Sequence, residues 1–340
     1  MTIDTTRRGF LAGTTALGAS SLIAMPAIAQ AQKPVMRISH QVPPAHHLNK
    51  MLQVFVDEAK KLTSDSIDIQ VFGSEQIAKA NDNFPGVARG ALEAAISTNF
   101  QWGQTLPEPN AISIPFMIST LEQIRKFPTS DARKLIDEKL KTRQVESLCW
   151  FYTTRQAIYT NNKAPIVKPE DFKGLKIRGF NALNDAGLRA VGAAPIALPA
   201  PEVYQALQSG VLDAGLTDVS AAVSRRFYEV QKFGTVSPSL CVYFHMYCNP
   251  AWFAKLTKAQ QDALRQAATK AEADAIAITE ETAGAAIGQL RQRGMTVHEQ
   301  TAAEAAAWRD AMRPPVIDAF LKFAPEGGAR IIDLLTKGLA

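Results

Sequence analysis

Arg178 is the residue of this chain best placed to bind an anion. The alternating segment before it predicts a short strand, with Leu175 and Ile177 on one face and Arg178 on the other. In open α/β folds, ligands bind where strands end, and a guanidinium can donate two parallel hydrogen bonds to one carboxylate. The segment therefore predicts a carboxylate-binding site. An isolated arginine more often makes a surface ion pair, and this segment alone leaves that alternative open.

Motifs for catalysis are not found in the sequence. It contains no Gly-x-Ser-x-Gly nucleophile turn, no His-Glu-x-x-His zinc motif and no phosphate-binding loop. None of the three cysteines has neighbours that would activate a thiolate. We therefore predict a binding protein with no catalytic residues and no cofactor. An exported hydrolase or isomerase is the alternative from another class.

Three segments around Arg178 carry a common pattern. They are Asp171–Arg178 (Asp-Phe-Lys-Gly-Leu-Lys-Ile-Arg), Gly192–Asp213 (Gly-Ala-x-Pro, then Glu-Val-Tyr-x-Ala-Leu-Gln-x-Gly-Val-x-Asp) and the aromatic segment Tyr152–Asn162. Together they resemble the solute-binding proteins of TRAP transporters, the family of periplasmic dicarboxylate-binding proteins. A weaker similarity runs from about Met36 to the C-terminal region.

The resemblance implies a fold and a function. The fold is α/β of the periplasmic-binding-protein type II-like kind, with two α/β domains, a ligand cleft between them and a long helix spanning both. The function is to capture a small organic acid outside the cytoplasm and to deliver it to the membrane permease subunits of a TRAP transporter. We expect a monomer. A binding protein of an ABC importer or a sensor would have the same fold and is the alternative.

The resemblance also implies roles for single residues. Arg178 would pair with the ligand carboxylate, and Arg155 would add a second positive contact. The chain departs from the family at Ala200, where an aromatic residue is common, and at Thr217, where asparagine is common. Both positions lie where the family lines its pocket, so Thr217 and the following Asp218 are predicted to contact the ligand.

No metal site is predicted. The acidic position that some family members use for a metal falls near Leu216 here. His46 and His47 are adjacent, so their side chains diverge, and no cysteine or nearby carboxylate completes a ligand set.

Further candidate ligand contacts follow predicted strands or lie in a loop that the family places near its ligand. His40 ends the first predicted strand, Asn99 and Trp102 follow the third, and Glu75 lies in that loop. Tyr243 and His245 lie on one face of the strand that alternation predicts at 241–249. Trp102 is explained equally well as a core residue. Arg225 and Arg226 are interpreted as a solvated pair.

The acids near the predicted pocket bear on the ligand. Glu75 and Asp218 would repel a second carboxylate, and Ala200 removes bulk from the pocket wall. We therefore expect a monocarboxylate, such as a 2-oxo, 2-hydroxy or aromatic acid.

The N-terminal residues 1–31 predict an export signal. Thr6–Leu11 carries the twin arginines followed by Phe-Leu, and an apolar run extends to Ala29. Small residues at 27–29 and 29–31 offer cleavage sites. The mature protein is therefore expected in the periplasm, exported by the twin-arginine route.

Charge and hydropathy limit the partners of the mature chain. Removing residues 1–31 leaves 35 basic and 31 acidic residues, with no run of lysine or arginine. Nucleic-acid binding usually needs a clustered basic face, so a small anion is the better match. No later segment approaches the roughly 18 apolar residues that span a bilayer.

The order of predicted elements indicates two α/β domains. A β-α-β-α-β succession opens the mature chain, which favours a parallel sheet covered by helices. We assign 33–152 with 244–288 to the first domain, and 153–243 with 289–340 to the second. A capping box at Thr257–Gln260 starts a proline-free helix that ends near Arg293 and would be about 54 Å long. A coiled coil is the alternative, but an alanine-rich seam is a poor one.

The cysteines predict buried thiols. Cys241 and Cys248 lie on one predicted strand, about 23 Å apart when extended, which is too far for a disulfide. A bridge between Cys149 and Cys241 stays open at this point.

Overall fold

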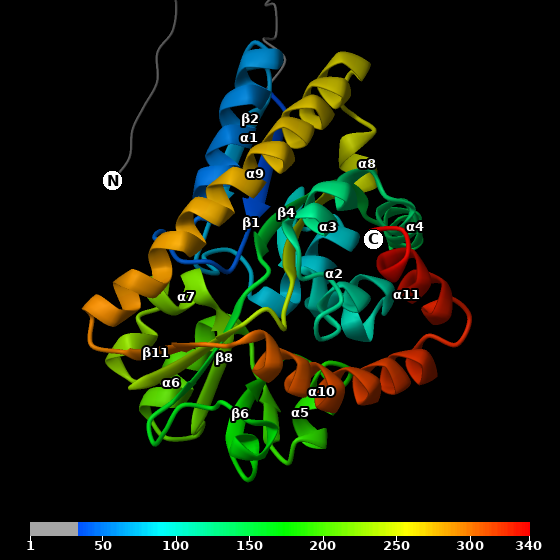
Figure 1. Ribbon diagram of the computed structural model, residues 1–340. Coiled ribbons are helices and arrows are strands. Elements are labelled where there is room, and N and C mark those ends of the chain that lie inside the picture. Colours follow the sequence, from blue (N-terminus) through cyan, green and yellow to red (C-terminus); the bar gives the residue numbers. More distant parts are fainter. Residues whose placement is uncertain (1–32) are drawn as a thin grey trace, which may run out of the picture. The chain divides into compact units, whose positions relative to one another are not determined.

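The computed structural model describes residues 33–340, apart from the side chains of Gly103 and Gln104. The predicted export signal and its cleavage sites lie outside the described residues. Residues 33–340 form one compact unit that contains two sheets. We call the first sheet with the helices packed on it the first lobe, and the second sheet with its helices the second lobe (Figure 1).

The first sheet combines parallel and antiparallel strands. Its spatial order is β2 (Asp68–Phe72), β1 (Val35–Ser39), β3 (Ala94–Thr98), β10 (Val242–Cys248) and β4 (Glu146–Thr154). Strand β1 runs parallel to both β2 and β3, which confirms the prediction of a parallel β-α-β-α-β opening. Strand β10 returns antiparallel between β3 and β4. The strand predicted at 241–249 is therefore a crossing back into the first lobe.

The second sheet is built mainly from the middle of the chain. Its spatial order is β11 (Thr296–Glu299), β9 (Phe233–Ser237), β5 (Ala157–Asn161), β8 (Ala214–Asp218), β6 (Lys176–Gly179) and β7 (Ala194–Ala197). Strands β6, β7 and β8 are parallel neighbours, so their carboxyl ends meet at one edge. Arg178 and Asp218 both lie at that edge.

Helices cover both sheets. They are α1 (Leu48–Leu62), α2 (Asn83–Ala88), α3 (Leu121–Lys126), α4 (Asp131–Lys141), α5 (Asp185–Ala190), α6 (Ala200–Gln208), α7 (Val219–Ser224), α8 (Pro250–Phe253), α9 (Lys258–Gln292), α10 (Ala302–Phe323) and α11 (Gly328–Thr336). Short 3-10 turns lie at η1 (Ala80–Asp82), η2 (Asn99–Gln104), η3 (Glu108–Ser113), η4 (Phe127–Thr129), η5 (Pro169–Phe172) and η6 (Phe227–Glu229).

Helix α9 joins the lobes, as predicted. It starts at the capping box of Thr257 and Gln260 and continues for 35 residues, or about 52 Å. It packs on α1 and β4 of the first lobe and on α7 and β11 of the second (Figure 1). Alanines form most of its buried face, so it approaches its neighbours closely.

The C-terminal helices lie on different lobes. Helix α10 packs along α5, whereas α11 packs against α4 and η3 (Figure 1). Leu335 and Leu339 are fully buried there. The boundaries assigned to the two domains stay a prediction, because residues 33–340 form one unit.

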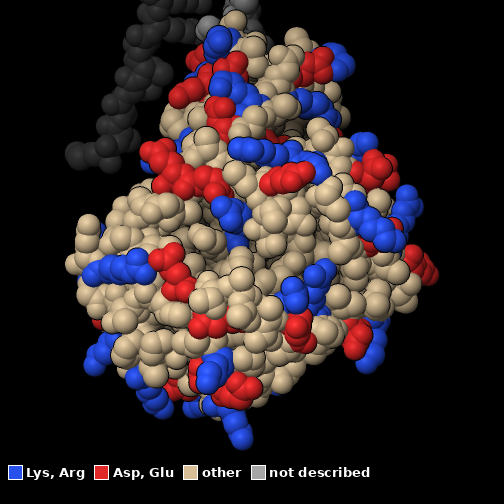
Figure 2. Space-filling view, in the orientation of Figure 1, with Lys and Arg blue, Asp and Glu red and all other residues tan. Residues whose placement is uncertain are grey.

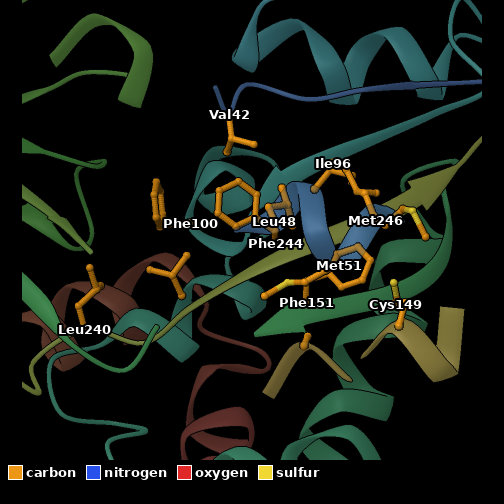
Figure 3. Close-up of a cluster of buried hydrophobic side chains, with 14 of the residues drawn as sticks. Val42, Leu48, Met51, Ile96, Phe100, Cys149, Phe151, Leu240, Phe244 and Met246 are labelled. Atoms are coloured by element: carbon orange, nitrogen blue, oxygen red, sulfur yellow. The ribbon is translucent and has the colours of Figure 1, made fainter. Parts of the chain in front are cut away.

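Both faces of β10 are buried. Phe244 and Met246 lie beside Leu48 and Met51 of α1 (Figure 3), and Val242 belongs to the same apolar cluster. Tyr243 and Tyr247 belong to a second apolar cluster on the other face. Full burial of a large apolar side chain contributes roughly 1.5–3 kcal/mol. Burial on both faces makes β10 the centre of the first lobe.

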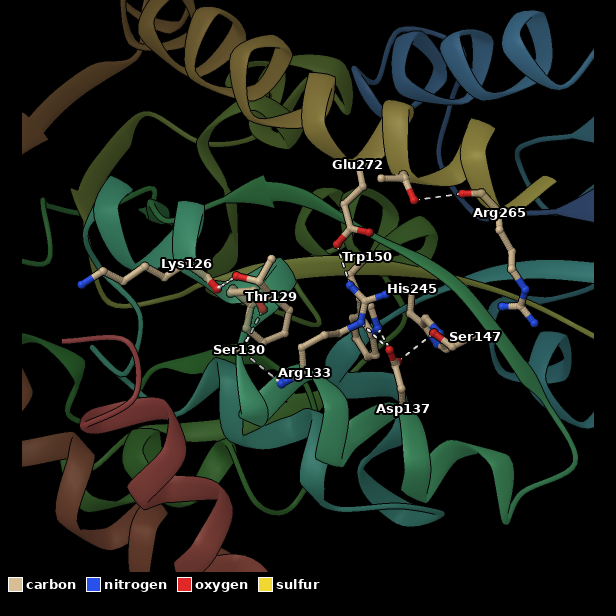
Figure 4. Close-up of polar contacts among 12 residues, drawn as sticks. Lys126, Thr129, Ser130, Arg133, Asp137, Ser147, Trp150, His245, Arg265 and Glu272 are labelled. Atoms are coloured by element: carbon tan, nitrogen blue, oxygen red, sulfur yellow. Dashed lines mark hydrogen bonds and ion pairs between the residues drawn. The ribbon is translucent and has the colours of Figure 1, made fainter. Parts of the chain in front are cut away.

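A buried polar network ties α9 to the first lobe (Figure 4). Arg133 of α4 pairs with Asp137 at 2.5 Å and with Glu272 of α9 at 2.6 Å. The other carboxylate oxygen of Asp137 accepts hydrogen bonds from Ser147 and from the indole of Trp150. One cation therefore neutralises two acids from different helices.

The three cysteines all lie among the described residues. Cys149, Cys241 and Cys248 are free and buried, so the bridge between Cys149 and Cys241 that the sequence left open is not formed.

Within 33–340, no three His, Cys, Asp or Glu side chains are grouped to hold a metal, and no helix is long and apolar enough to cross a membrane. On the face drawn in Figure 2, basic and acidic side chains are interspersed.

Candidate ligand-binding site

Arg178 lies at the end of β6, in the cleft between the lobes. Its side chain is buried, with 3% of the residue exposed. Its Nε donates to the carbonyl oxygen of Leu198 at 3.2 Å and its Nη1 to that of Leu216 at 2.8 Å. The ring of Phe180 lies 4.9 Å from the guanidinium carbon. These contacts fix the plane of the guanidinium and leave Nη2 without a protein partner among the described residues.

Two adjoining cavities meet at Arg178. The larger, of about 340 Å³, is lined by both lobes: Gln41, Ala80, Asn81, Phe84, Ser97, Phe100, Gln101, Trp102, Thr105, Arg178, Phe180, Asn181, Ala197, Leu198, Pro199 and Ala200. The smaller, of about 30 Å³, is lined by Gln41, His46, Thr98, Phe100, Arg178, Phe180, Ala200, Thr217, Asp218, Ala221, Arg225, Leu240, Val242 and Phe244. A ligand in this cleft would contact both lobes.

Arg178 forms no ion pair within residues 33–340, although Asp218 and Asp185 are near enough to act on its charge. Burial, together with the nearby charge of Arg225, lowers the pKa of its guanidinium to about 9. The side chain therefore stays cationic at neutral pH. A buried, unpaired cation beside a cavity is a site for an anion.

Comparison with known proteins identifies the family of this chain. Residues 38–322 match the model of the bacterial extracellular solute-binding protein family 7, DctP. The chain belongs to this family. The resemblance to TRAP solute-binding proteins is therefore confirmed.

Three relatives illustrate the family. The C4-dicarboxylate-binding periplasmic protein DctP of Rhodobacter capsulatus is 28% identical, over 91% of this chain and 92% of its own length. A TRAP periplasmic solute-binding protein from Desulfovibrio salexigens, solved with orotic acid, has a TM-score of 0.85 at 24% identity and covers 90% of this chain and 99% of its own. One from Polaromonas, solved with D-erythronate, has a TM-score of 0.82 at 25% identity, with 89% and 98% covered.

Thr217 and Asp218 of this family 7 protein line the smaller cavity, at the end of β8. Asp218 caps α7, because its Oδ1 accepts a hydrogen bond of 2.7 Å from the Ala221 amide. Burial raises the pKa of its carboxyl to about 6, against the opposite effects of the Ala221 hydrogen bond and Arg225. Asp218 is thus an acid that titrates near neutral pH inside the cleft.

The interpretation of Arg225 as a solvated residue is wrong. Its guanidinium lines the smaller cavity, and its Nε is buried without a partner. Only Arg226 is exposed, where it pairs with Glu229. The sequence contains a signal for the burial of Arg225 beside Asp218. Asp218, Ala221 and Arg225 are spaced three and four residues apart, which places them on one helix face.

Of the two candidates after β3, the structure brings only Trp102 to the cleft. Trp102 lines the larger cavity. Asn99 is buried behind it, where its amide donates to Pro109 and Ser113 and its oxygen accepts from the Tyr243 amide. Asn99 therefore holds η2 and η3 against β10.

Glu75 and His40 lie near the cleft but do not line its cavities. Glu75 accepts a hydrogen bond of 2.8 Å from the Ala80 amide and pairs with Lys79. His40 accepts from the Val42 amide, and burial lowers the pKa of its imidazole to about 4. The neighbouring Gln41, which sequence reasoning missed, lines both cavities.

Tyr243 and His245 line neither cavity, because other side chains cover their face of β10. His245 stacks on Trp150 with ring centroids 4.1 Å apart, and its Nε2 lies 2.9 Å from Ser147 Oγ. Tyr243 packs against Phe127. The opposite face presents Val242 and Phe244 to the smaller cavity instead.

Arg155 lies outside both cavities. It follows β4 and pairs with Glu280 of α9, with its Nη2 2.8 Å from the carboxylate. A ligand contact for Arg155 stays a prediction, because no cavity-lining residue is next to it in this conformation.

Proposed function

We propose that this protein captures a small organic acid in the cleft between its lobes and delivers it to a TRAP-type membrane transporter. The observation that carries the proposal is the guanidinium of Arg178, buried at the junction of two cavities and without an ion pair among residues 33–340. Its unused donors suit one carboxylate, which would form charge-assisted hydrogen bonds in a site with little water. Arg178 anchors the ligand, Thr217 and Trp102 line its site, and Arg155 acts after a change of conformation.

The relatives support an acidic ligand. One is a C4-dicarboxylate-binding protein, and the other two were solved with orotic acid and D-erythronate, so each of these compounds carries a carboxyl group. The compounds otherwise differ, because one has two carboxyl groups, one is a ring acid and one is a polyhydroxy acid. The shared carboxylate is therefore the part that we transfer to this chain.

The compartment follows from the family and from the N-terminal segment. We place the mature protein in the periplasm, as a monomer without a cofactor or a bound metal, and we assign its export to the twin-arginine route. The motivation for that route is Thr6–Leu11 together with the apolar run and cleavage sites after it.

Mass spectrometry of ligand retained through purification tests the proposal, followed by calorimetry with the acid identified. We expect one organic acid that binds and is released unchanged. Absence of binding across a broad panel of carboxylic acids would contradict the proposal, and conversion of the acid to a product would favour an enzyme. Uptake into proteoliposomes that contain TRAP membrane subunits, rather than an ABC importer, tests the delivery step.

A further inference from the structure

Arg225 brings a second guanidinium to the smaller cavity. It follows α7 directly, and its side chain donates no hydrogen bond to any described residue, although a guanidinium has five N–H donors. Burial lowers the pKa of this guanidinium to about 10, while Asp218 and Glu75 act in the opposite direction. Neither acid forms an ion pair with it. Arg225 is therefore a second cation in the cleft whose donors lack a protein partner.

The surroundings of the two arginines leave room for an anion. Arg178 uses Nε and Nη1 for backbone carbonyls and keeps Nη2 free. The third charged residue, Asp218, has one oxygen committed to the Ala221 amide. Two cations and one acid give this compartment a net positive charge, and a bound anion would relieve the repulsion between the cations.

The smaller cavity is large enough for the carboxylate group of a ligand. A volume of about 30 Å³ accommodates one or two water molecules, or a group of similar size such as a carboxylate. It shares Gln41, Phe100, Phe180 and Ala200 with the larger cavity. A ligand whose charged end fills the smaller cavity would therefore extend its body into the larger one.

The larger cavity favours an uncharged body with a ring. Arg178 is the only charged residue among the described residues that line it, and its other polar lining groups are amides, hydroxyls and the indole N–H of Trp102. Four aromatic rings line it in two pairs: Phe84 with Trp102, at 4.8 Å between centroids, and Phe100 with Phe180, at 4.3 Å. Aromatic faces stack on planar groups. A second carboxylate would find no cation of its own there.

From these observations we infer that Arg225 and Arg178 together hold the anionic group of the ligand in the smaller cavity, and that the ligand is a monocarboxylate with an uncharged ring in the larger cavity. The inference rests on the proposed function and adds the second anchor and the chemical class of the ligand. Asp218 lowers the net charge of the compartment, so the site matches one carboxylate rather than two.

Probes of matched shape test the ligand class. Calorimetry compares benzoate, 4-carbamoylbenzoate, terephthalate and lactate. We expect 4-carbamoylbenzoate to bind at least tenfold more tightly than terephthalate, because the two differ only in whether the second substituent is charged, and a ring acid to bind more tightly than lactate. Terephthalate or lactate as the tightest ligand would overturn the class, and so would no binding by any of the four at millimolar concentration.

Arg225→Gln tests the second anchor, with the tightest probe or the acid retained through purification. We expect at least a tenfold loss of affinity, partial recovery in Arg225→Lys, and a melting temperature of the free protein that does not fall, because an unpaired cation is removed. The matched control is Arg226→Gln at the exposed neighbouring position, with less than a twofold change.

The two failures are distinguishable. Tight binding of an acid by the wild type with no effect of Arg225→Gln would overturn only the role of Arg225. A lower melting temperature in Arg225→Gln without ligand would indicate a structural role and would also overturn it. Absence of any bound acid in the wild type would contradict the proposed function itself.

Discussion

Arg155 and Glu280 form an ion pair between the link that joins β4 to β5 and the long helix α9. The Arg155 Nη2 lies 2.8 Å from one Glu280 oxygen, while the other oxygen accepts a hydrogen bond from the Tyr152 hydroxyl at 2.7 Å. The hydrogen bond to Glu280 raises the pKa of the Arg155 guanidinium. Both side chains are more than a quarter exposed, so the pair can open at modest cost. It ties a chain crossing between the lobes to the helix that spans them.

The first prediction compares the two arginines. We expect Arg178→Lys to weaken ligand binding by about 30- to 4,000-fold, because removing one partner of a buried charge pair costs roughly 2–5 kcal/mol. A lysine cannot reproduce the two parallel hydrogen bonds. Arg155→Lys should have a smaller effect, because its present partner is Glu280. Calorimetry on both variants measures this difference.

The matching control is the melting temperature of both variants without ligand, which should stay close to that of the wild type. A loss below threefold for Arg178→Lys, or a larger loss at Arg155 than at Arg178, would contradict the assignment.

The second prediction concerns closure of the cleft. The ligand would contact both lobes, which are joined by the β4–β5 link, the β9–β10 segment, α9 and the α10–α11 segment. Hinge closure is the common response of proteins built this way. We expect small-angle scattering to give a smaller radius of gyration at saturating ligand. An unchanged scattering profile, with saturation verified by calorimetry, would count against closure.

The third prediction is that affinity for a carboxylate increases as the pH falls from 8 to about 5.5. Asp218, with a pKa of about 6, becomes protonated in this range, and its loss of charge favours a bound anion beside Arg178 and Arg225. The buried imidazoles of His40 and His46 stay neutral there, because burial lowers their pKa values. Calorimetry across this range checks the slope.

Asp218→Asn is the control for the pH dependence, since asparagine also caps helices well. It should bind with an affinity that changes little with pH. The sign for stability is also fixed: a carboxyl with a raised folded-state pKa stabilises the fold at low pH and loses that contribution as the pH rises through about 6. The stability of the variant relative to the wild type should therefore increase with pH. If the affinity and the stability of the two proteins changed equally with pH, the role of Asp218 would be refuted.

The fourth prediction concerns export. Replacing Arg7 and Arg8 together by lysine should leave uncleaved precursor in the cytoplasm, because the twin-arginine pathway recognises this pair. Cell fractionation and immunoblotting check the result. Normal accumulation of mature protein in the periplasm would exclude this route.

The fifth prediction concerns the buried network of Arg133, Asp137 and Glu272. We expect Arg133→Met to lower the free energy of unfolding by about 3 kcal/mol or more, because two acids lose their cation in a site with little water. Arg309→Met is the control, since its pair with Asp310 is exposed, and it should change stability by less than about 1 kcal/mol. Equal effects in urea denaturation would contradict a special role for the buried network.

Local patterns in the sequence predicted most of the elements. The capping box at Thr257 marks the start of α9, and alternation marks β10 to within one residue at each end. These signals depend on neighbours along the chain, so no knowledge of the tertiary fold was needed.

The candidate site was harder to predict, because tertiary packing decides which face meets the cleft. Alternation along β10 places Tyr243 and His245 on one face and Val242 and Phe244 on the other, and both faces are covered. The polar face was predicted to contact the ligand, but the apolar face lines the smaller cavity. Arg225 and Arg226 are chemically alike, and only the packing of α7 buries the first. Arg178 was placed correctly in the cleft because the end of a parallel strand has a fixed position in the sheet.

The place of β10 between β3 and β4 determines when this chain can fold. A nascent chain that has just completed β4 cannot assemble the first sheet, because the strand that belongs between its neighbours has not been synthesised. The core around α4 waits even longer, since Leu335 and Leu339, which belong to it, follow β10 in the sequence. The first sheet therefore closes only after strands β5 to β9 of the second sheet have been made, so the two lobes cannot fold in the order in which their residues are synthesised.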